Sequence, residues 1–226
     1  MGSGFKIVPL GLDAVSVEFG DAISIDLNER VIAFADAISA DPFPGFVEAF
    51  PAYSSVTVVF DPRVVRRTST TTETVVDSVS KALSERVDAA ASRSSYERRI
   101  LEIQVDFSPS AGPDLPECAK RSGLSIADFI RIFTAREYRV FMLGFLPGFA
   151  YMGIVDKELE QPRRPDPRSR IEKGSVGIAG RQTGIYPLAS PGGWQIVGRT
   201  YVEMFLPRSD RPALLAPGDR VRFIQS

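Results

Sequence analysis

The segment QPRRPDPRSR, residues 161–170, holds arginines between prolines and could bind an anion. A guanidinium group offers a planar fork of N–H donors that matches a carboxylate or a phosphate. Proline stiffens the backbone, so the arginines would lose less conformational freedom on meeting such a group. They are Arg163, Arg164, Arg168 and Arg170. A solvated surface loop has the same composition, and the segment alone leaves both interpretations open.

Uncharged polar side chains follow in a stretch rich in glycine and proline, GIAGRQTGIYPLASPGGWQIVGRT, residues 177–200. Hydroxyl and carboxamide groups can donate and accept hydrogen bonds, as recognition of an amide or lactam requires. The candidates for such contacts are Gln182, Thr183, Tyr186 and Gln195.

Two further loops are candidates for shaping a pocket, and the first of them, taken alone, would also fit a buried aromatic loop. LGFLPGFAYMG, residues 143–153, places aromatic rings around a Pro-Gly turn, and SPGG precedes the only tryptophan. The pocket-shaping residues are Phe145, Pro147, Gly148, Phe149, Tyr151, Pro191, Gly192 and Gly193. Nearby, GSVGIAG (174–180) matches neither common nucleotide-binding glycine motif, and no helical pattern follows it. It favours tight turns between strands over a backbone phosphate cradle.

The absence of histidine removes whole classes of chemistry. The chain has no histidine and one cysteine, Cys118, which excludes Ser-His-Asp and Cys-His catalysis, metal sites built on histidine or several thiolates, and an internal disulfide. General acid–base catalysis would have to use Asp, Glu, Tyr, Lys, Arg, the backbone or residues of a partner. No residue stands out as catalytic, and no metal is expected.

Charge and hydropathy point to a cytoplasmic globular protein. The net charge of −1 gives no global attraction to nucleic acid or to an anionic membrane. No apolar run approaches the roughly 18–20 residues that span a bilayer, and the N-terminus shows no secretory signal. Cytoplasm is the default for a chain with so little cysteine.

The first 92 residues predict a small α+β sandwich. Apolar residues alternate along the strand-like runs, and one face of each helical run is apolar. A helix should follow from Asp26, because Asp26 can cap it and Glu29 lies three residues on. The expected strands are 5–11, 14–19, 43–51 and 54–62, and a second helix is expected over 72–91. Strands and helices in this order place the helices on one sheet face.

Residues 93–226 predict a β-barrel. A polar linker is expected over 90–99, followed by a strand at 100–105 and short helices over 114–122 and 125–133. Ser125 with Asp128 resembles a capping box, and Gly123 is placed to end the first helix. This helix pair has too few basic residues to read DNA and should pack on the barrel. Short apolar strands between Gly and Pro clusters are expected at 138–143, 175–179, 194–198, 201–206 and 220–224.

Taken together, these stretches resemble one protein family. The matching motifs are GFLPGFAYMG, PRRPDPRSR, GSVGIAGRQTGIYPLASPGGWQIVGRT and LLAPGDRVRF, with VEFGDAISIDLNERV and PGFVEAFPAYSSVTVVFDP in the N-terminal half. The family is the B subunit of bacterial 5-oxoprolinase, also known as allophanate hydrolase subunit 1 or sporulation-kinase inhibitor. The same module forms part of the carboxyltransferase region of urea carboxylase.

The resemblance implies a fold, partners and an activity. It implies an α+β N-terminal domain followed by a cyclophilin-like barrel, with a homologous C subunit as heterodimer partner (possibly doubled) and with an A subunit. The implied complex opens 5-oxoproline to glutamate with ATP and Mg, and this chain alone is inactive. Allophanate or another small amide is an alternative substrate. A regulatory protein that binds a sensor histidine kinase is an alternative of another class.

The resemblance also directs attention to particular residues. We expect Arg164, Arg168 and Arg199 to hold a carboxylate or phosphate, and the glycines of 177–198 to let turns approach a ligand or a partner barrel. Two positions depart from the family pattern. Phe133 stands where relatives often carry histidine, and FSPSAGPDL (107–115) replaces a YGGEFGPDL-like loop while keeping Asp114.

Overall fold

A computed structural model of the chain describes residues 4–69, 73–90 and 99–226. The chain divides into two compact units, Met1–Glu97 and Arg98–Ser226. The linker expected over 90–99 lies almost wholly outside the described residues, and so does the expected boundary between 92 and 93.

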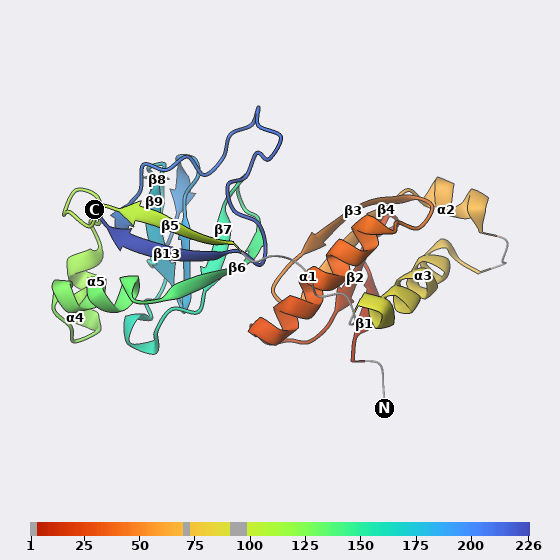
Figure 1. Ribbon diagram of the computed structural model, residues 1–226, viewed down its shortest axis with the longest axis horizontal. Coiled ribbons are helices and arrows are strands. Elements are labelled where there is room, and N and C mark those ends of the chain that lie inside the picture. The colour runs from red at the N-terminus through yellow and green to blue at the C-terminus, as the bar shows by residue number, and fades with distance from the viewer. Residues whose placement is uncertain (1–3, 70–72, 91–98) are drawn as a thin grey trace. The chain divides into compact units, whose positions relative to one another are not determined.

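The first unit is a four-stranded antiparallel sheet with helices (Figure 1). The strand order is β1-β2-β4-β3, with bounds Lys6–Pro9, Ala14–Glu18, Ser55–Phe60 and Phe46–Pro51. The helices are α1 (Ile25–Ala40), α2 (Pro62–Thr68) and α3 (Val75–Ala90).

Alternation along the central strands builds the core of this unit. Val15 and Val17 of β2 are fully buried, and in β4 every second residue, such as Val58, is buried too. They form one apolar cluster with Phe34 of α1 and Leu83 of α3. Helices therefore cover one face of the sheet, and the predicted α+β class is confirmed.

Two local expectations in this unit were wrong. Helix α1 begins at Ile25 with Ser24 as the N-cap residue, so Asp26 lies in the first turn and caps nothing. The strand expected over 54–62 ends at Phe60, and Pro62 begins α2. Asp61 accepts hydrogen bonds from the backbone of Arg63 and Val64, which is the cap that Asp-Pro supplies at a helix start.

The second unit is a nearly closed barrel (Figure 1). Its strand order is β12-β9-β10-β7-β6-β13-β5, with bounds Gln195–Arg199, Ser175–Ala179, Gln182–Ile185, Ala150–Gly153, Glu137–Leu143, Arg220–Gln225 and Ile100–Val105. The two edge strands meet where Asp106 and Arg199 exchange backbone hydrogen bonds of 2.8 and 2.9 Å. A separate ribbon pairs β8 (Arg168–Ile171) with β11 (Ser190–Gly192).

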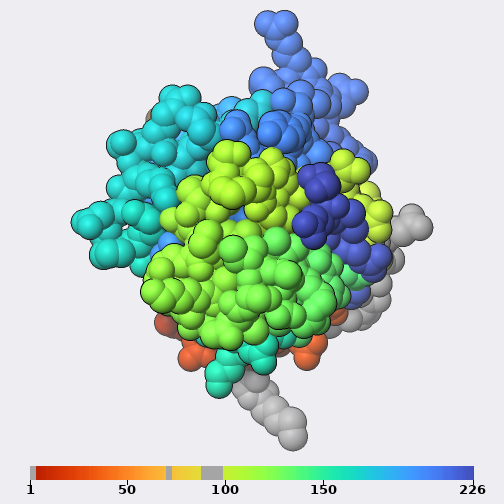
Figure 2. All heavy atoms as spheres, turned by 90° about the vertical axis from the view of Figure 1, so that its left-hand side faces the viewer, coloured from red at the N-terminus to blue at the C-terminus, as the bar shows by residue number. Residues whose placement is uncertain are grey.

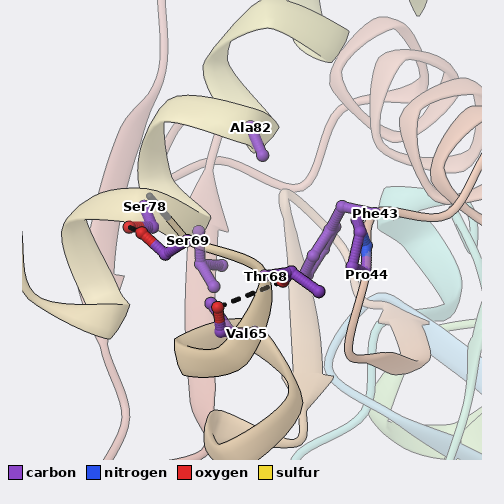
Figure 3. A pocket seen from close by; sticks show the side chains of 8 residues that line it. Phe43, Pro44, Val65, Thr68, Ser69, Ser78 and Ala82 are labelled. Atoms are coloured by element: carbon purple, nitrogen blue, oxygen red, sulfur yellow. Dashed lines mark hydrogen bonds between the residues drawn. The ribbon is translucent and has the colours of Figure 1, made fainter. Parts of the chain in front are cut away.

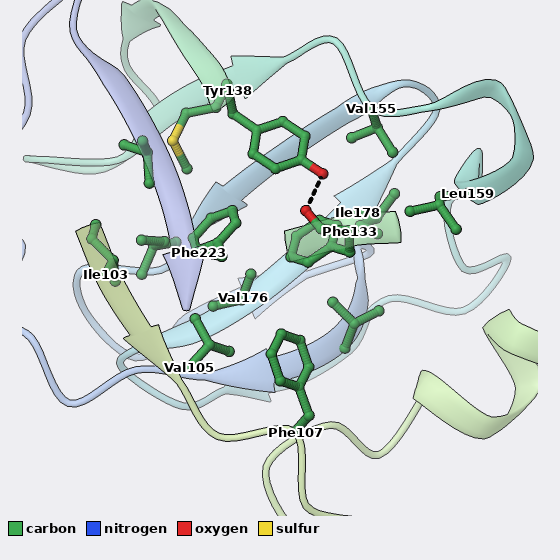
Figure 4. Packing of buried hydrophobic residues seen from close by; sticks show 14 of the residues in the cluster. Ile103, Val105, Phe107, Phe133, Tyr138, Val155, Leu159, Val176, Ile178 and Phe223 are labelled. Carbon is green, nitrogen blue, oxygen red and sulfur yellow. Dashed lines mark hydrogen bonds between the residues drawn. The ribbon is translucent and has the colours of Figure 1, made fainter. Parts of the chain in front are cut away.

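Aromatic rings fill the inside of the barrel, as Figure 4 shows. Phe133 is fully buried and stacks on Phe223, with ring centroids 5.0 Å apart. The Tyr138 hydroxyl donates a 2.8 Å hydrogen bond to the Phe133 carbonyl. Phe133, one of the two departures from the family pattern, is therefore a core residue here.

The helices α4 (Leu115–Arg121) and α5 (Ile126–Thr134) cover one side of the barrel (Figure 2). Phe129 of α5 is buried in the barrel core, which confirms the packing role expected for this pair. The Ser125 hydroxyl accepts a hydrogen bond from the Asp128 backbone at the start of α5, as predicted. Gly123, which follows α4, has a φ of +68°.

The strand expected over 201–206 does not form. Only an isolated bridge joins Phe205 to Ala213, and the segment between β12 and β13 projects from the barrel as a loop (Figure 1). Strands β7, β8, β10 and β11 were not predicted; they have three or four residues each, too few to show an alternating pattern.

Candidate functional site

A buried carboxylate, Asp114, gathers the arginine loop onto the barrel. Arg168 donates to both Asp114 oxygens, at 2.8 and 2.7 Å, and Arg164 donates to one of them at 3.1 Å. The backbone N–H of Ile196, in β12, adds a fourth bond of 2.7 Å. These bonds use the acceptor capacity of the carboxylate, so Asp114 is a structural anchor and not a free base.

Two of the three arginines expected to hold an anion, Arg164 and Arg168, are thus already bound to a carboxylate of the chain itself. The hydrogen bonds that Arg168 donates to Asp114 raise the pKa of Arg168 above its usual value. One carboxylate faces two guanidinium groups, so the cluster keeps an excess of positive charge. No local signal could have revealed it, because Asp114 lies 50 and 54 residues before its partners.

Four aromatic rings pack together on the outer face of the barrel. The Phe149 ring lies 4.9 Å from Tyr151, 5.2 Å from Tyr186 and 5.5 Å from Trp194, in edge-on geometries. Val176 and Ile178 of β9 point into the barrel core, whereas the ring cluster includes Ala179 of the same strand. The rings therefore cover the opposite side of the sheet from the core.

The glycines of the 177–198 stretch make room for these rings. A Cβ atom on Gly184 would lie 2.9 Å from the Phe149 ring, and one on Gly177 would lie 3.1 Å from Trp194. On β11, a Cβ on Gly192 would lie 2.5 Å from the Tyr186 hydroxyl. The close approach expected toward a ligand is filled here by the chain's own side chains.

The backbone of residues 174–180 has no free N–H groups with which to hold a phosphate. Gly174 donates its backbone N–H to Tyr186, and Gly180 donates to Gln161. Gly177 lies inside β9, paired on both sides. This run is a strand with a turn at each end, and its backbone does not fit the phosphates of ATP.

Burial moves the ionisation of both phenols of the cluster to higher pH. It raises the pKa of Tyr186 to about 12, although a backbone hydrogen bond at Trp194 acts in the other direction. Burial also raises the pKa of Tyr151, and the nearby charge of Arg163 opposes that rise. Both hydroxyls therefore carry their protons near neutral pH and cannot act as bases there.

The uncharged polar candidates have different roles. The Thr183 hydroxyl is fully buried and donates to the Gly177 carbonyl at 2.9 Å. The Gln195 amide donates to the Pro162 carbonyl at 3.0 Å and so holds the arginine loop. Gln182 lies opposite Gly153 and Ala179, and its side chain makes no hydrogen bond within the part of the chain that the structure describes.

Arg199 lies apart from the other two predicted arginines. It ends β12, four residues after Gln195, which is about 13 Å along an extended strand. Its Nε donates to the Lys173 carbonyl at 3.0 Å, and its guanidinium lies over the Tyr201 ring. The structure brings Arg164 and Arg168 together and leaves Arg199 near the point where the barrel closes.

The Pro-Gly loop carries an exposed aromatic ring in a strained backbone. Phe145 has a φ of +66° and a side chain left largely exposed, with its ring 5.8 Å from Phe149. Pro147 and Pro191 lie at the surface. Gly148 packs so closely on Phe205 that a Cβ there would lie 2.9 Å from the Phe205 Cβ. Gly193 accepts a hydrogen bond from the Arg164 backbone.

A hollow of about 170 Å³ lies in the first unit, between α2, α3 and Phe43–Pro44 (Figure 3). Its polar lining groups are hydroxyls. Thr68 donates to the Val64 and Val65 carbonyls, and Ser69 and Ser78 lie 3.2 Å apart. It offers no charged group for amide chemistry, so the candidate site remains on the barrel.

Metal ligands and membrane spans can be assessed only over residues 4–69, 73–90 and 99–226. Within these ranges no three His, Cys, Asp or Glu side chains gather as a metal site would require. No helix there has the length and apolar character needed to cross a bilayer.

Comparison with known proteins identifies the class first. Residues 5–215 match the family described as "Carboxyltransferase domain, subdomain C and D". One segment of the Kluyveromyces lactis urea carboxylase has the same fold, with a TM-score of 0.72 at 20% identity over 98% of this chain and 22% of that one. The chain is a carboxyltransferase subdomain C and D protein.

Closer relatives narrow this class to one family. The chain is 42% identical to the 5-oxoprolinase B subunit of Bacillus subtilis, over 98% of this chain and 92% of the relative. It is 36% identical to the Escherichia coli O157:H7 protein of the same name, over 95% and 93%. The chain belongs to the family of 5-oxoprolinase B subunits.

A solved structure shows the same module inside a longer chain. The crystal structure of TTHA0988 superposes with a TM-score of 0.80 at 37% identity. The match covers 94% of this chain but only 40% of TTHA0988.

Proposed function

We propose that this chain is the B subunit of an ATP-dependent 5-oxoprolinase, a complex that opens 5-oxo-L-proline to L-glutamate. The proposal rests on sequence similarity, 42% and 36% identity over 98% and 95% of this chain, to proteins named as B subunits of 5-oxoprolinase. Membership of that family makes the chain part of an enzyme complex, and the substrate and the use of ATP are what we add.

Within the complex we assign this chain to lactam recognition. A primary carboxamide carries a donor and an acceptor side by side, which matches the N–H and C=O edge of a lactam. Gln182 is the candidate, because its side chain is uncommitted and lies on the same face of the sheet as Tyr151.

We assign ATP and Mg to the rest of the complex. The glycine run of this chain has no spare backbone donors, and Arg164 and Arg168 are held by Asp114. A homologous C subunit and an A subunit are the proposed partners. The longer TTHA0988 chain supports this, since more than half of it lies beyond the shared module.

The test is ATP hydrolysis by this chain mixed with its cognate A and C subunits, with and without 5-oxoproline. We expect 5-oxoproline to stimulate hydrolysis and glutamate to appear. An assembled complex that shows neither would refute the proposal.

The Q182A variant tests the role of this chain. We expect turnover to fall by about tenfold or more, since a hydrogen bond to the reacting amide is lost. Folding should be intact, because the side chain supports nothing else in the described structure. The matched control is S169A, which truncates an exposed polar residue on β8 and should leave turnover unchanged. Unchanged turnover in Q182A would remove Gln182 from the site.

A further inference from the structure

Arg163 is the arginine of the 161–170 loop whose charge is uncommitted. Arg164 and Arg168 bind Asp114, and Arg170 pairs with Glu172 at 2.6 Å. Arg163 is exposed and makes no hydrogen bond or ion pair within the part of the chain that the structure describes. It was one of several arginines in the sequence, and nothing there distinguished it.

The backbone around Arg163 is fixed on both sides. The Pro162 carbonyl accepts a hydrogen bond from the Gln195 side chain at 3.0 Å, and the Arg164 N–H donates to the Gly193 carbonyl at 2.8 Å. These two anchors flank Trp194, so Arg163 lies across from the tryptophan of the aromatic cluster. Its charge also influences Tyr151 and Tyr186 of that cluster.

One backbone bridge links the segments that carry Arg163 and Gln182. Gln161 and Gly180 exchange backbone hydrogen bonds of 3.3 and 2.6 Å. Arg163 is two residues after Gln161, and Gln182 is two residues after Gly180. Because this bridge is antiparallel, the two segments run in opposite directions from it, and the backbones of Arg163 and Gln182 lie up to about 13 Å apart, a separation that the long arginine side chain helps to span.

We propose that Arg163 binds the carboxylate of the substrate and makes the site specific for acidic lactams over neutral ones. The proposal rests on the proposed function, because it names a second contact to the same substrate. A single uncommitted guanidinium fork matches a carboxylate, whereas a phosphate dianion takes several donors and the neighbouring backbone donors are used. Asp114 holds Arg164 and Arg168 and so fixes the loop that carries Arg163.

The test compares R163M with wild type in the assembled complex, on 5-oxoproline and on 2-pyrrolidinone, the same lactam without a carboxylate. We expect R163M to raise the KM for 5-oxoproline by about 10- to 100-fold, as loss of a charged hydrogen-bonded pair does. Its kcat/KM for 2-pyrrolidinone should stay unchanged. R163K should restore part of the affinity, because lysine keeps the charge and loses the fork.

R170M is the matched control, since it removes an exposed arginine of the same loop that is already paired with Glu172. It should leave both substrates unaffected. A KM for 5-oxoproline that does not change in R163M overturns the inference, and so does an equal loss with both lactams.

Calorimetric binding of 5-oxoproline and of inorganic phosphate to the same complexes separates the two proposals. Binding of 5-oxoproline that depends on Arg163, in a complex without 5-oxoprolinase activity, would keep this inference and refute the proposed function. Turnover of 5-oxoproline that is unchanged in R163M would support the proposed function and refute this inference. Competition by phosphate at this residue would show a phosphate site instead and overturn the carboxylate assignment.

Discussion

At the scale of single residues, Asp114 carries more of the site's architecture than any side chain that was predicted there. It joins the start of α4, the arginine loop and β12 through one nearly buried carboxylate. Removing one member of such a group leaves the others desolvated and unpaired, which costs more than the group contributes when intact.

We therefore expect D114N to destabilise the second unit by about 2–4 kcal/mol, below the full cost of a buried pair because both arginines are partly exposed. The NH2 group of the asparagine would also face an N–H donor of an arginine or of the Ile196 backbone. Urea unfolding followed by Trp194 fluorescence measures the effect. E203Q, which breaks the half-exposed Lys173–Glu203 pair, should cost less than about 1 kcal/mol. Equal effects of the two variants would contradict the anchoring role.

Tyr186 gives a second prediction at this scale, on pH. Burial raises its folded pKa from 10.0 to about 12. A group whose pKa is raised on folding contributes stability that is fully present below its unfolded pKa and lost as pH rises through the folded value. Unfolding free energy should accordingly fall between pH 10 and pH 12, by up to about 2–3 kcal/mol from this residue.

The Y186F variant isolates that contribution, because it keeps the ring and removes the titrating group. Its loss of stability between pH 9 and pH 11.5 should be smaller than that of wild type, measured by urea unfolding. Parallel pH profiles would show that Tyr186 ionises as freely when folded as when unfolded.

At the scale of elements, local rules succeeded where the signal lay in neighbouring residues. Alternating valines marked β2 and β4, and Ser125 with Asp128 marked the start of α5. The rules failed at 201–206, where an apolar run forms a projecting loop instead of a strand. Apolar content favours burial of some kind, but pairing needs a neighbouring strand edge, and the sequence does not show which edges are occupied.

The same reasoning explains what could be predicted of the site. The resemblance to one family indicated that the loops at 143–153 and 161–170 and the glycine-rich stretch belong together. It did not indicate that Phe149 and Trp194 fill the space above Gly184 and Gly177, because that depends on which strands are adjacent. Nor did it separate committed arginines from free ones.

The Pro-Gly loop offers a prediction with opposite signs at two positions. Phe145 adopts a left-handed φ that glycine reaches without strain, and its ring is largely exposed. We expect F145G to leave stability unchanged or raise it by up to about 1 kcal/mol. G148A should instead lower it by about 1–3 kcal/mol, because its φ is +80° and its Cβ would meet Phe205.

Thermal unfolding of both variants, followed by Trp194 fluorescence, checks this pair. A loss above about 1 kcal/mol in F145G would mean that the exposed ring supports the fold after all. If the prediction holds, folding does not require the Phe145 ring, and a requirement for it in the assembled complex would have to come from function.

At the scale of the whole molecule, two separate cores share one chain. The first unit buries Leu83 among the strands and helices of residues 4–90, and the second buries Phe133 and Ile103 inside the barrel. The candidate site draws its residues from the second unit alone, with Asp114, Arg163, Gln182 and Trp194 all beyond residue 98. Binding of the proposed lactam substrate should therefore survive a loss of stability in the first unit.

The single tryptophan makes this independence measurable, because Trp194 belongs to the second unit and reports its unfolding alone. L83A should destabilise the first unit by about 2–5 kcal/mol, so the circular dichroism of its helices should be lost at lower urea while the Trp194 transition stays in place. I103A should do the reverse and move the Trp194 transition. If L83A shifted both signals together, the two units would unfold as one cooperative body, and effects of first-unit substitutions on turnover could then no longer be separated from effects on the site.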